Sequence, residues 1–155
     1  MRIDYYKHPE IMGPMRAFSQ AASGGSLEPK LLELVKVRAS QLNGCAHCLE
    51  MHTKDARAGG ESDDRLHLVA VWQEAPMFTD RERAALLWCE ELTLLAERDV
   101  SDEIYGAVSD VFSEDEICQL TLAVMVINSW NRLAVGLRAP VGDHVARVPR
   151  APAPS

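Results

Sequence analysis

Apolar residues recur every three or four positions along most of this chain, and there is no convincing strand-length run of alternating apolar and polar residues. A spacing of three and four places apolar side chains on one face of an α-helix, whereas a half-buried strand needs alternation. The pattern, interrupted at glycines and prolines, predicts helices over residues 9–22, 29–42, 45–59, 62–74 and 80–97, a shorter helix after residue 101, and a final helix over 114–137. We therefore expect an all-α fold, a single-domain bundle of six to seven helices.

Local signals indicate where several of these helices begin. Pro29 suits a first helical turn, because the N–H that proline lacks would be unpaired there in any case. Residues 79–82 (Thr-Asp-Arg-Glu) and 113–116 (Ser-Glu-Asp-Glu) both match a capping box, in which two side chains satisfy backbone groups at the start of a helix. Asn43–Gly44 is a break between the second and third helices, so these two helices are expected to pair across a short turn.

The final predicted helix is apolar on most of its sides. Ile117, Leu120, Val124 and Ile127 fall near one face, and further apolar residues occupy the others. Such a helix is buried in its own domain or in a subunit interface. From Ala139 onward the chain loses its periodicity. We therefore predict a helical domain over residues 1–138 and an extended or disordered tail over residues 139–155.

Composition and charge narrow the classes of function. The 155 residues are 47% hydrophobic and carry a formal net charge of -7, which is ordinary for a globular protein and unfavourable for binding phosphate backbones or anionic lipids. No long apolar run follows the early basic residue, and the longest apolar runs elsewhere look too short to span a bilayer. Four cysteines in this length are too sparse for a secreted disulfide framework. These observations predict a cytoplasmic protein with neither nucleic acid nor membrane as a partner.

The stretch that carries candidate chemistry surrounds Cys45 and Cys48. These residues are three apart, and His52 follows four residues later, so all three side chains lie on one face of a helix. The preceding Asn43–Gly44 break places both cysteines in the first turn, where free backbone N–H groups and the helix dipole favour a thiolate. The spacing therefore predicts a reactive pair of thiols.

Each of these residues has a plausible task in peroxide reduction. A thiolate at Cys48 would attack the outer oxygen of a peroxide and become a sulfenic acid, and Cys45 would condense with it to a disulfide. Glu33 lies nearly one helix length upstream, so an antiparallel pairing brings it toward the same face. If buried, its pKa would be raised and it could accept a thiol proton. His52 could carry that proton, since histidine titrates near neutral pH.

Other interpretations of the same residues must be weighed. Cys45, Cys48 and His52 supply three possible zinc ligands, but a structural zinc site needs four. A thioredoxin-like protein would need a βαβ context, and covalent haem attachment would need a histidine at position 49, where Leu49 stands. A zinc site thus stays open, and the other two are rejected.

The remaining cysteines, histidines and tryptophans are expected to have structural roles only. Cys89 and Cys118 are expected to be small core residues. The tryptophans are expected to pack in the core or an interface; they are Trp72, Trp88 and Trp130. The histidines outside the pattern are expected to be surface or packing residues; they are His8, His67 and His144.

The motif resembles that of the alkylhydroperoxidase D (AhpD) branch of the carboxymuconolactone decarboxylase-like superfamily. That family's signature, a glutamate followed after eleven residues by Cys-x-x-Cys-x-x-x-His, is matched by Glu33, Cys45, Cys48 and His52. Some members also carry a histidine just before the second cysteine, as His47 does here. Residues 128–133 (Asn-Ser-Trp-Asn-Arg-Leu) look like a segment of the family's final helix, so the resemblance extends over roughly residues 29–137.

The resemblance implies an all-helical enzyme that usually forms trimers or hexamers. It implies that Cys48 is the peroxidatic residue, that Cys45 is the proton donor and resolving thiol, and that a proton relay is formed by Glu33, His47 and His52. The implied partners are a peroxide and a dithiol or protein-thiol reductant, with no cofactor. Two alternatives stay open: a related enzyme acting as a disulfide reductase or lactone decarboxylase, and a non-enzymatic metal-binding module. The decarboxylases lack the paired cysteines, which disfavours that interpretation.

Overall fold

The computed structural model describes residues 1–146, and every regular element in that range is a helix, which confirms the predicted all-α fold class. Seven α-helices follow one another along the described chain, with a short 3-10 turn η1 (Tyr5–Lys7) before the first helix and another, η2 (Val69–Val71), after the fourth. The helices are α1 (Pro9–Ala22), α2 (Pro29–Leu42), α3 (Ala46–Ala58), α4 (Asp63–Leu68), α5 (Asp80–Thr93), α6 (Asp102–Ser109) and α7 (Glu114–Leu137).

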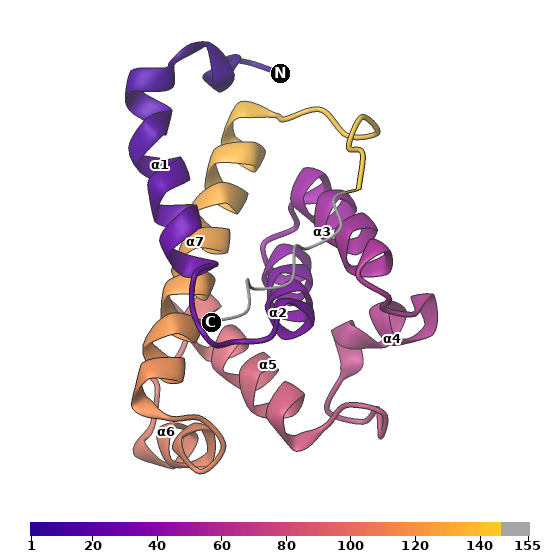
Figure 1. The fold of residues 1–155 in the computed structure, drawn as a ribbon, viewed down its shortest axis with the longest axis vertical. Coiled ribbons are helices and arrows are strands. Elements are labelled where there is room, and N and C mark those ends of the chain that lie inside the picture. Colours follow the sequence, from indigo (N-terminus) through magenta and orange to yellow (C-terminus); the bar gives the residue numbers. More distant parts are fainter. Residues whose placement is uncertain (147–155) are drawn as a thin grey trace.

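Helix α2 occupies the centre of the bundle and contacts α3, α5 and α7 (Figure 1). Helix α1 lies along α7, α6 lies at the end of α5 and the start of α7, and α4 continues from α3 at the edge of the fold. The backbone of Arg2 donates to the carbonyl of Leu137, so the N-terminal segment reaches the end of α7. This arrangement leaves the α2–α3 turn against α7.

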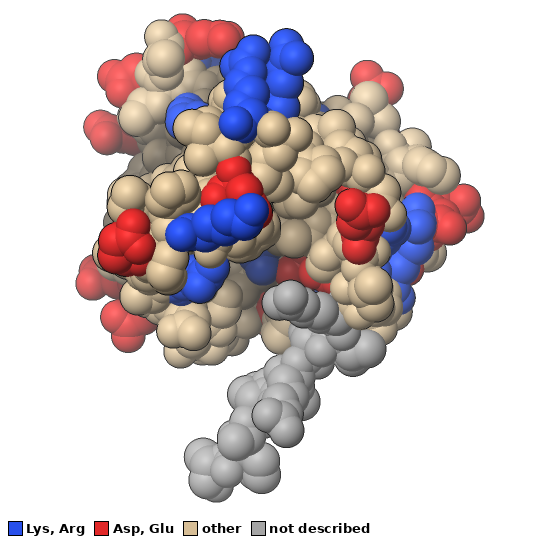
Figure 2. All heavy atoms as spheres, turned by 90° about the horizontal axis from the view of Figure 1, so that it is seen from above, with Lys and Arg blue, Asp and Glu red and all other residues tan. Residues whose placement is uncertain are grey.

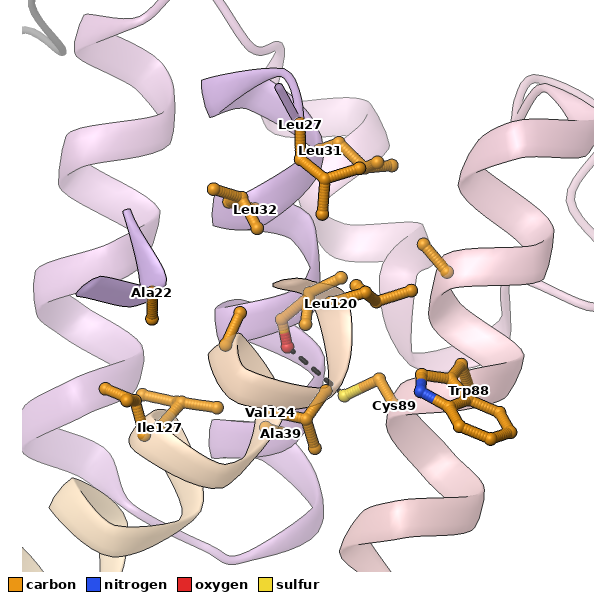
Figure 3. Packing of buried hydrophobic residues seen from close by; sticks show 14 of the residues in the cluster. Ala22, Leu27, Leu31, Leu32, Ala39, Trp88, Cys89, Leu120, Val124 and Ile127 are labelled. Carbon is orange, nitrogen blue, oxygen red and sulfur yellow. Dashed lines mark hydrogen bonds between the residues drawn. The ribbon is translucent and has the colours of Figure 1, made fainter. Parts of the chain in front are cut away.

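The core is built from apolar residues of α1, α2, α5 and α7 (Figure 3). Leu120, Val124 and Ile127 of α7 are at most 2% exposed. The thiol of the buried Cys89 donates to the carbonyl of Val35 at 3.4 Å, as the dashed line shows. Cys89 is therefore a core residue, as predicted, and its hydrogen bond joins α5 to α2.

Helix α4 ends at Leu68, six residues earlier than the pattern predicts. The chain tightens into η2 at two β-branched residues, Val69 and Val71, which are poorer helix formers. The Arg83 guanidinium then binds the carbonyls of Trp72, Gln73 and Ala75, groups that a continuing helix would have used internally. Helix α5 likewise stops before the predicted residue 97, at Thr93.

Both predicted capping boxes are present. The hydroxyl of Thr79 accepts from the Glu82 backbone while the Glu82 carboxylate accepts from the Thr79 backbone, and Ser113 with Glu116 does the same for α7. Local sequence therefore defines the starts of α5 and α7.

Helix α7 is long and apolar enough, by length and composition, to cross a bilayer, which the sequence analysis had judged absent. Its buried residues form the core with α2 and α5, as in the central helix of many globular proteins. One face is open: Met125 and Val135 are 52% and 50% exposed. Cys118 is also exposed, so its prediction as a core residue was wrong; it lies one residue away from the buried Ile117 on the outer side of the helix.

After α7 the described part of the tail, residues 139–146, has no helix or strand and passes over α3 (Figure 1). Residues 147–155 of the predicted tail lie outside the described residues. On the face seen in Figure 2, basic and acidic side chains are interspersed, and they form no continuous basic surface there.

Candidate active site

The turn between α2 and α3 brings the predicted thiol pair to the start of α3. Gly44 has a φ of 63°, a left-handed conformation that glycine adopts without strain, and the Cys45 N–H donates back to the Ser40 carbonyl at 3.0 Å. Cys45 becomes the N-cap of α3, and its sulfur accepts the Cys48 backbone N–H at 3.3 Å. The two cysteines therefore share one helical turn as free thiols.

The pKa values of the two thiols are shifted in opposite directions. A hydrogen bond from the Cys48 thiol, together with the Cys48 backbone N–H, Asn131 and the charge of His47, outweighs burial and lowers the pKa of Cys45 to about 6. That same hydrogen bond, burial and the neighbouring charge of Cys45 raise the pKa of Cys48. These directions favour negative charge on Cys45, at the N-cap position, over the thiolate expected at Cys48.

Glu33 lies against this helix, with its side chain only 11% exposed. One carboxylate oxygen is 2.9 Å from Nδ1 of His52, and the other accepts from the Lys36 ammonium at 2.8 Å. Burial alone would raise the pKa of Glu33, but the bond and charge of His52, together with Lys36, lower it to about 2. The predicted raised pKa was therefore wrong, because the hydrogen bond with His52 and the Lys36 ammonium favour the ionised carboxylate. Glu33 cannot be a ready proton acceptor, and it orients His52 instead.

A buried amide network supports the cysteines from α7. Asn131 is fully buried; its Oδ1 accepts from Asn43 at 2.9 Å and its Nδ2 donates to Ser40 at 3.2 Å. Hydrogen bonding by the same amide helps to lower the pKa of Cys45 and offsets part of the rise in the pKa of Cys48. The sequence placed Asn131 only in the segment that resembles the family's final helix, and its contacts in the site were not predicted. A polar residue in the middle of a highly apolar helix was the signal that could have indicated them.

A cavity of about 680 Å³ opens beside α3, and Cys48 and His52 line it whereas Cys45 does not. Met51, Val126, Ile127 and Trp130 are among its apolar lining residues. Both cysteines are about 1% exposed, so Cys48 meets this cavity through a small part of its surface and Cys45 lies behind it. A molecule in the cavity would therefore encounter Cys48 first.

Tyr5 also lines the cavity and was not predicted to be near the site. Burial, Tyr6 and the charges of the two cysteines raise its pKa. Its distance of forty residues from the motif left no local signal in the sequence.

The histidines occupy different positions around the cavity. His47 also lines the cavity, and its Nδ1 lies 2.5 Å from the carbonyl oxygen of Pro140 in the tail. His144, expected to be a surface or packing residue, lines the cavity and has its Nε2 2.7 Å from Asp55. His52 is thus the predicted histidine that the structure brings to both Glu33 and the cavity.

Donor atoms of Glu33, His52 and Asp55 lie within 4.8 Å of one another, close enough to hold a metal ion. The Lys36 ammonium, however, already occupies a Glu33 oxygen, and its positive charge opposes a cation there. Within residues 1–146 the cysteine pair belongs to no such donor cluster.

Comparisons with known proteins agree with this architecture. Residues 9–91 match the Carboxymuconolactone decarboxylase family. The chain is 37% identical over 137 residues to the uncharacterized protein YdfG of Bacillus subtilis, covering 88% of this chain and 93% of that protein.

Solved structures show the same fold. A protein of unknown function from Agrobacterium tumefaciens, ATU0492, described as belonging to AhpD-type antioxidant defence, superposes with a TM-score of 0.88 at 38% identity over 92% of this chain and 99% of that one. An AhpD-core, peroxidase-related protein from Ralstonia eutropha superposes with a TM-score of 0.79 at 19% identity, over 90% of this chain and 74% of that one. The chain therefore belongs to the carboxymuconolactone decarboxylase family, as an AhpD-like member of that superfamily.

Proposed function

We propose that this protein is a thiol-dependent peroxidase that reduces organic hydroperoxides with the Cys45–Cys48 pair. One observation carries the proposal: Cys48, which shares one helical turn with Cys45 and whose backbone N–H bonds the Cys45 sulfur, lines a cavity large enough for an organic molecule. Membership of the AhpD-like family supports a peroxidase-related function at the family level.

The first step uses the shared proton. Cys48 faces the cavity, so its sulfur attacks the outer peroxide oxygen while its proton passes to the Cys45 thiolate. The O–O bond breaks, the sulfur of Cys48 becomes a sulfenic acid, and the rest of the peroxide leaves as an alkoxide that takes up one proton. Cys45 is thus both the base in this step and the thiol that acts in the next.

The second step closes the disulfide. The Cys45 sulfur attacks Cys48, and the hydroxyl group leaves as water after taking the Cys45 proton. We propose that His52, one helical turn beyond Cys48 and hydrogen-bonded to Glu33, relays that proton. An external dithiol then reduces the disulfide by exchange. In this scheme Glu33 holds His52 in one orientation and stays ionised throughout.

The decisive experiment is a stopped-flow assay with an alkyl hydroperoxide and a dithiol reductant. We expect the reduced protein to lose two thiols together per equivalent of peroxide, and we expect Cys48→Ser to lose the activity. Cys89→Ser is the matched control, since Cys89 is buried in the core and away from the cavity. A Cys48→Ser protein that consumed peroxide at the parental rate would end the proposal. Turnover of a protein disulfide without peroxide reduction would instead favour the disulfide-reductase alternative.

We also propose that the protein acts in the cytoplasm as a homotrimer or homohexamer. The exposed apolar residues of α7, Met125 and Val135, support an association of subunits through this helix. Light scattering of the purified protein tests the oligomeric state, and a monodisperse monomer at micromolar concentration would contradict it.

A further inference from the structure

The described part of the tail is hydrogen-bonded along one face of α3. His47, Glu50 and Lys54 are spaced by three and four residues, so they form a single stripe on this helix. Their partners in the tail follow in the same order; they are the Pro140 carbonyl at His47, the Gly142 N–H at Glu50 and the His144 carbonyl at Lys54. Residues 140–144, called the strap below, therefore run beside α3 in the direction of that helix.

Short bonds hold the strap in this register. The Gly142 N–H donates to Glu50 at 2.7 Å, and the Lys54 ammonium donates to the His144 carbonyl at 3.0 Å. The Glu50 side chain is only 17% exposed, and the imidazole of His144 is bonded to Asp55. Gly142 has a φ of 110°, which glycine adopts far more readily than other residues. The sequence thus supplies a glycine at the turn of the strap that bonds Glu50.

The first contact of the strap determines which nitrogen of His47 carries a proton. Nδ1 lies 2.5 Å from the Pro140 carbonyl oxygen, and a carbonyl oxygen can only accept a hydrogen bond, so Nδ1 is the donor. In a neutral ring the proton is therefore on Nδ1, and Nε2 is left as the acceptor. Among the described residues, Pro140 is the one hydrogen-bond partner of this ring. The strap alone therefore fixes the protonation of the ring.

His47 lies close enough to the thiols for its position to matter. It directly precedes Cys48 and lines the same cavity. Its charge is among the causes that lower the pKa of Cys45. A change in the orientation of this ring would therefore change the surroundings of both sulfurs.

We propose that the strap is a positioning element for the thiol chemistry, holding His47 in its Nδ1–H form through the Pro140 carbonyl. This inference rests on the proposed peroxidase function. With Nδ1 bound to the strap, protons enter and leave the ring at Nε2, and the ring keeps one orientation beside Cys48. The family resemblance assigns His47 to a proton relay, and the strap gives that relay a fixed ring with one free nitrogen. Pro140 acts through His47 and contacts no reacting atom.

Other charged groups share the cavity with His47. They are Arg16 of α1, Lys36 of α2, His52 and Asp55 of α3, and Asp143 and His144 of the tail. Release of the strap would also move the two tail residues. The test must therefore compare release of the strap in the presence and in the absence of His47.

Two variants of the full-length protein release the strap by different routes. Gly142→Ala alters no charge and its Cβ meets no atom within 4 Å, so it acts by straining the backbone at a φ of 110°. Glu50→Ala removes the acceptor of the Gly142 N–H, whereas Glu50→Gln loses the same charge but keeps an oxygen that can accept. Gly106→Ala in α6 is the matched control, because its added methyl group also meets no neighbouring atom.

The first measurement is ¹⁵N NMR of the His47 ring in the reduced protein at about pH 8, where a histidine is largely neutral. We expect the Nδ1–H form in the parent, in Glu50→Gln and in Gly106→Ala. Gly142→Ala and Glu50→Ala should show the Nε2–H form that a free histidine ring favours.

The second measurement is single-turnover oxidation by tert-butyl hydroperoxide. Both release variants should react about 10-fold more slowly than the parent, as when a group that orients a functional histidine is lost. Combined with His47→Ala, either release variant should react no more slowly than His47→Ala alone, because the strap acts through that ring.

The outcomes separate this inference from the proposed function. An Nε2–H ring in the parent, or an unchanged ring in both release variants, would overturn the role of the strap and leave the thiol chemistry standing. So would a changed ring with a parental oxidation rate, or an equal loss of rate in the absence of His47. A parent that reduced no peroxide would overturn the proposed function and this inference with it. The expected NMR and kinetic pattern supports both.

Discussion

Replacing Glu33 by glutamine removes one negative charge from a buried network and keeps the side-chain shape. The carboxylate now faces His52 at 2.9 Å and Lys36 at 2.8 Å. These partners lower the pKa of Glu33 from 4.5 to about 2 against the effect of burial. At about 1.36 kcal/mol per pH unit, that preference for the charged form is on the order of 3 kcal/mol.

The sign of the pH dependence follows from the direction of this change. A carboxyl group that is more acidic in the folded protein stabilises the fold above pH 4.5, and the contribution disappears as the pH falls toward 2. We expect Glu33→Gln to be less stable than the parent by about 3 kcal/mol at pH 7, with a melting temperature lower by roughly 6–12 °C. The difference should shrink to about 1 kcal/mol at pH 3.

Urea unfolding at pH 7 and at pH 3, followed by circular dichroism, measures both differences. Glu74→Gln is the matched control, since Glu74 is exposed and its loss should change stability by less than about 0.5 kcal/mol at either pH. A Glu33→Gln protein as stable as the parent at pH 7 would refute the reasoning. So would a destabilisation of the same size at both pH values, which would indicate a packing effect rather than a lost charge.

Three further predictions concern the thiols, the buried amide beside them and the cap of α5. In the reduced parent, the thiolate absorbance near 240 nm should rise with a midpoint near pH 6, and a rise only above pH 8 would contradict the prediction. The same rise should remain in Cys48→Ser, because the serine hydroxyl can still donate to Cys45, and it should be lost in Cys45→Ser. Asn131→Ala should lower stability by about 1–3 kcal/mol in urea unfolding, because Asn43 and Ser40 lose buried partners, and should move the thiolate midpoint upward. Thr79→Ala should lower the free energy of unfolding by about 1 kcal/mol through the lost cap, and a larger loss would mean that Thr79 does more than cap α5.

The starts of the helices were predictable because they depend on neighbouring residues. Pro29, Thr79 and Ser113 are local signals, and each lies where the corresponding helix begins. The end of α4 was not predictable, because it depends on Arg83, which captures carbonyl groups from a segment eleven residues away. The exposure of Cys118 was equally hidden, since an apolar helix gives little indication of which side remains open.

In the candidate site, too, some features were predictable from the sequence and others were not. The spacing of Cys45, Cys48 and His52 fixes a shared face, and the short turn at Gly44 brings Glu33 to His52 as expected. The acid strengths were not predictable, because they depend on which sulfur caps the helix and on Lys36 beside Glu33. The remaining polar contributions to the site, from Tyr5, Asn131 and His144, come from distant parts of the chain that only the folded arrangement brings near the thiols.

The position of Cys45 behind Cys48 has a kinetic consequence. If a peroxide and a reducing dithiol both reach the pair through the cavity that Cys48 lines, they cannot occupy it together. Turnover would then follow a ping-pong scheme, in which the alcohol departs before the reductant enters. Plots of reciprocal rate against reciprocal peroxide concentration at several dithiol concentrations would run parallel, and excess dithiol would compete with peroxide for the reduced protein.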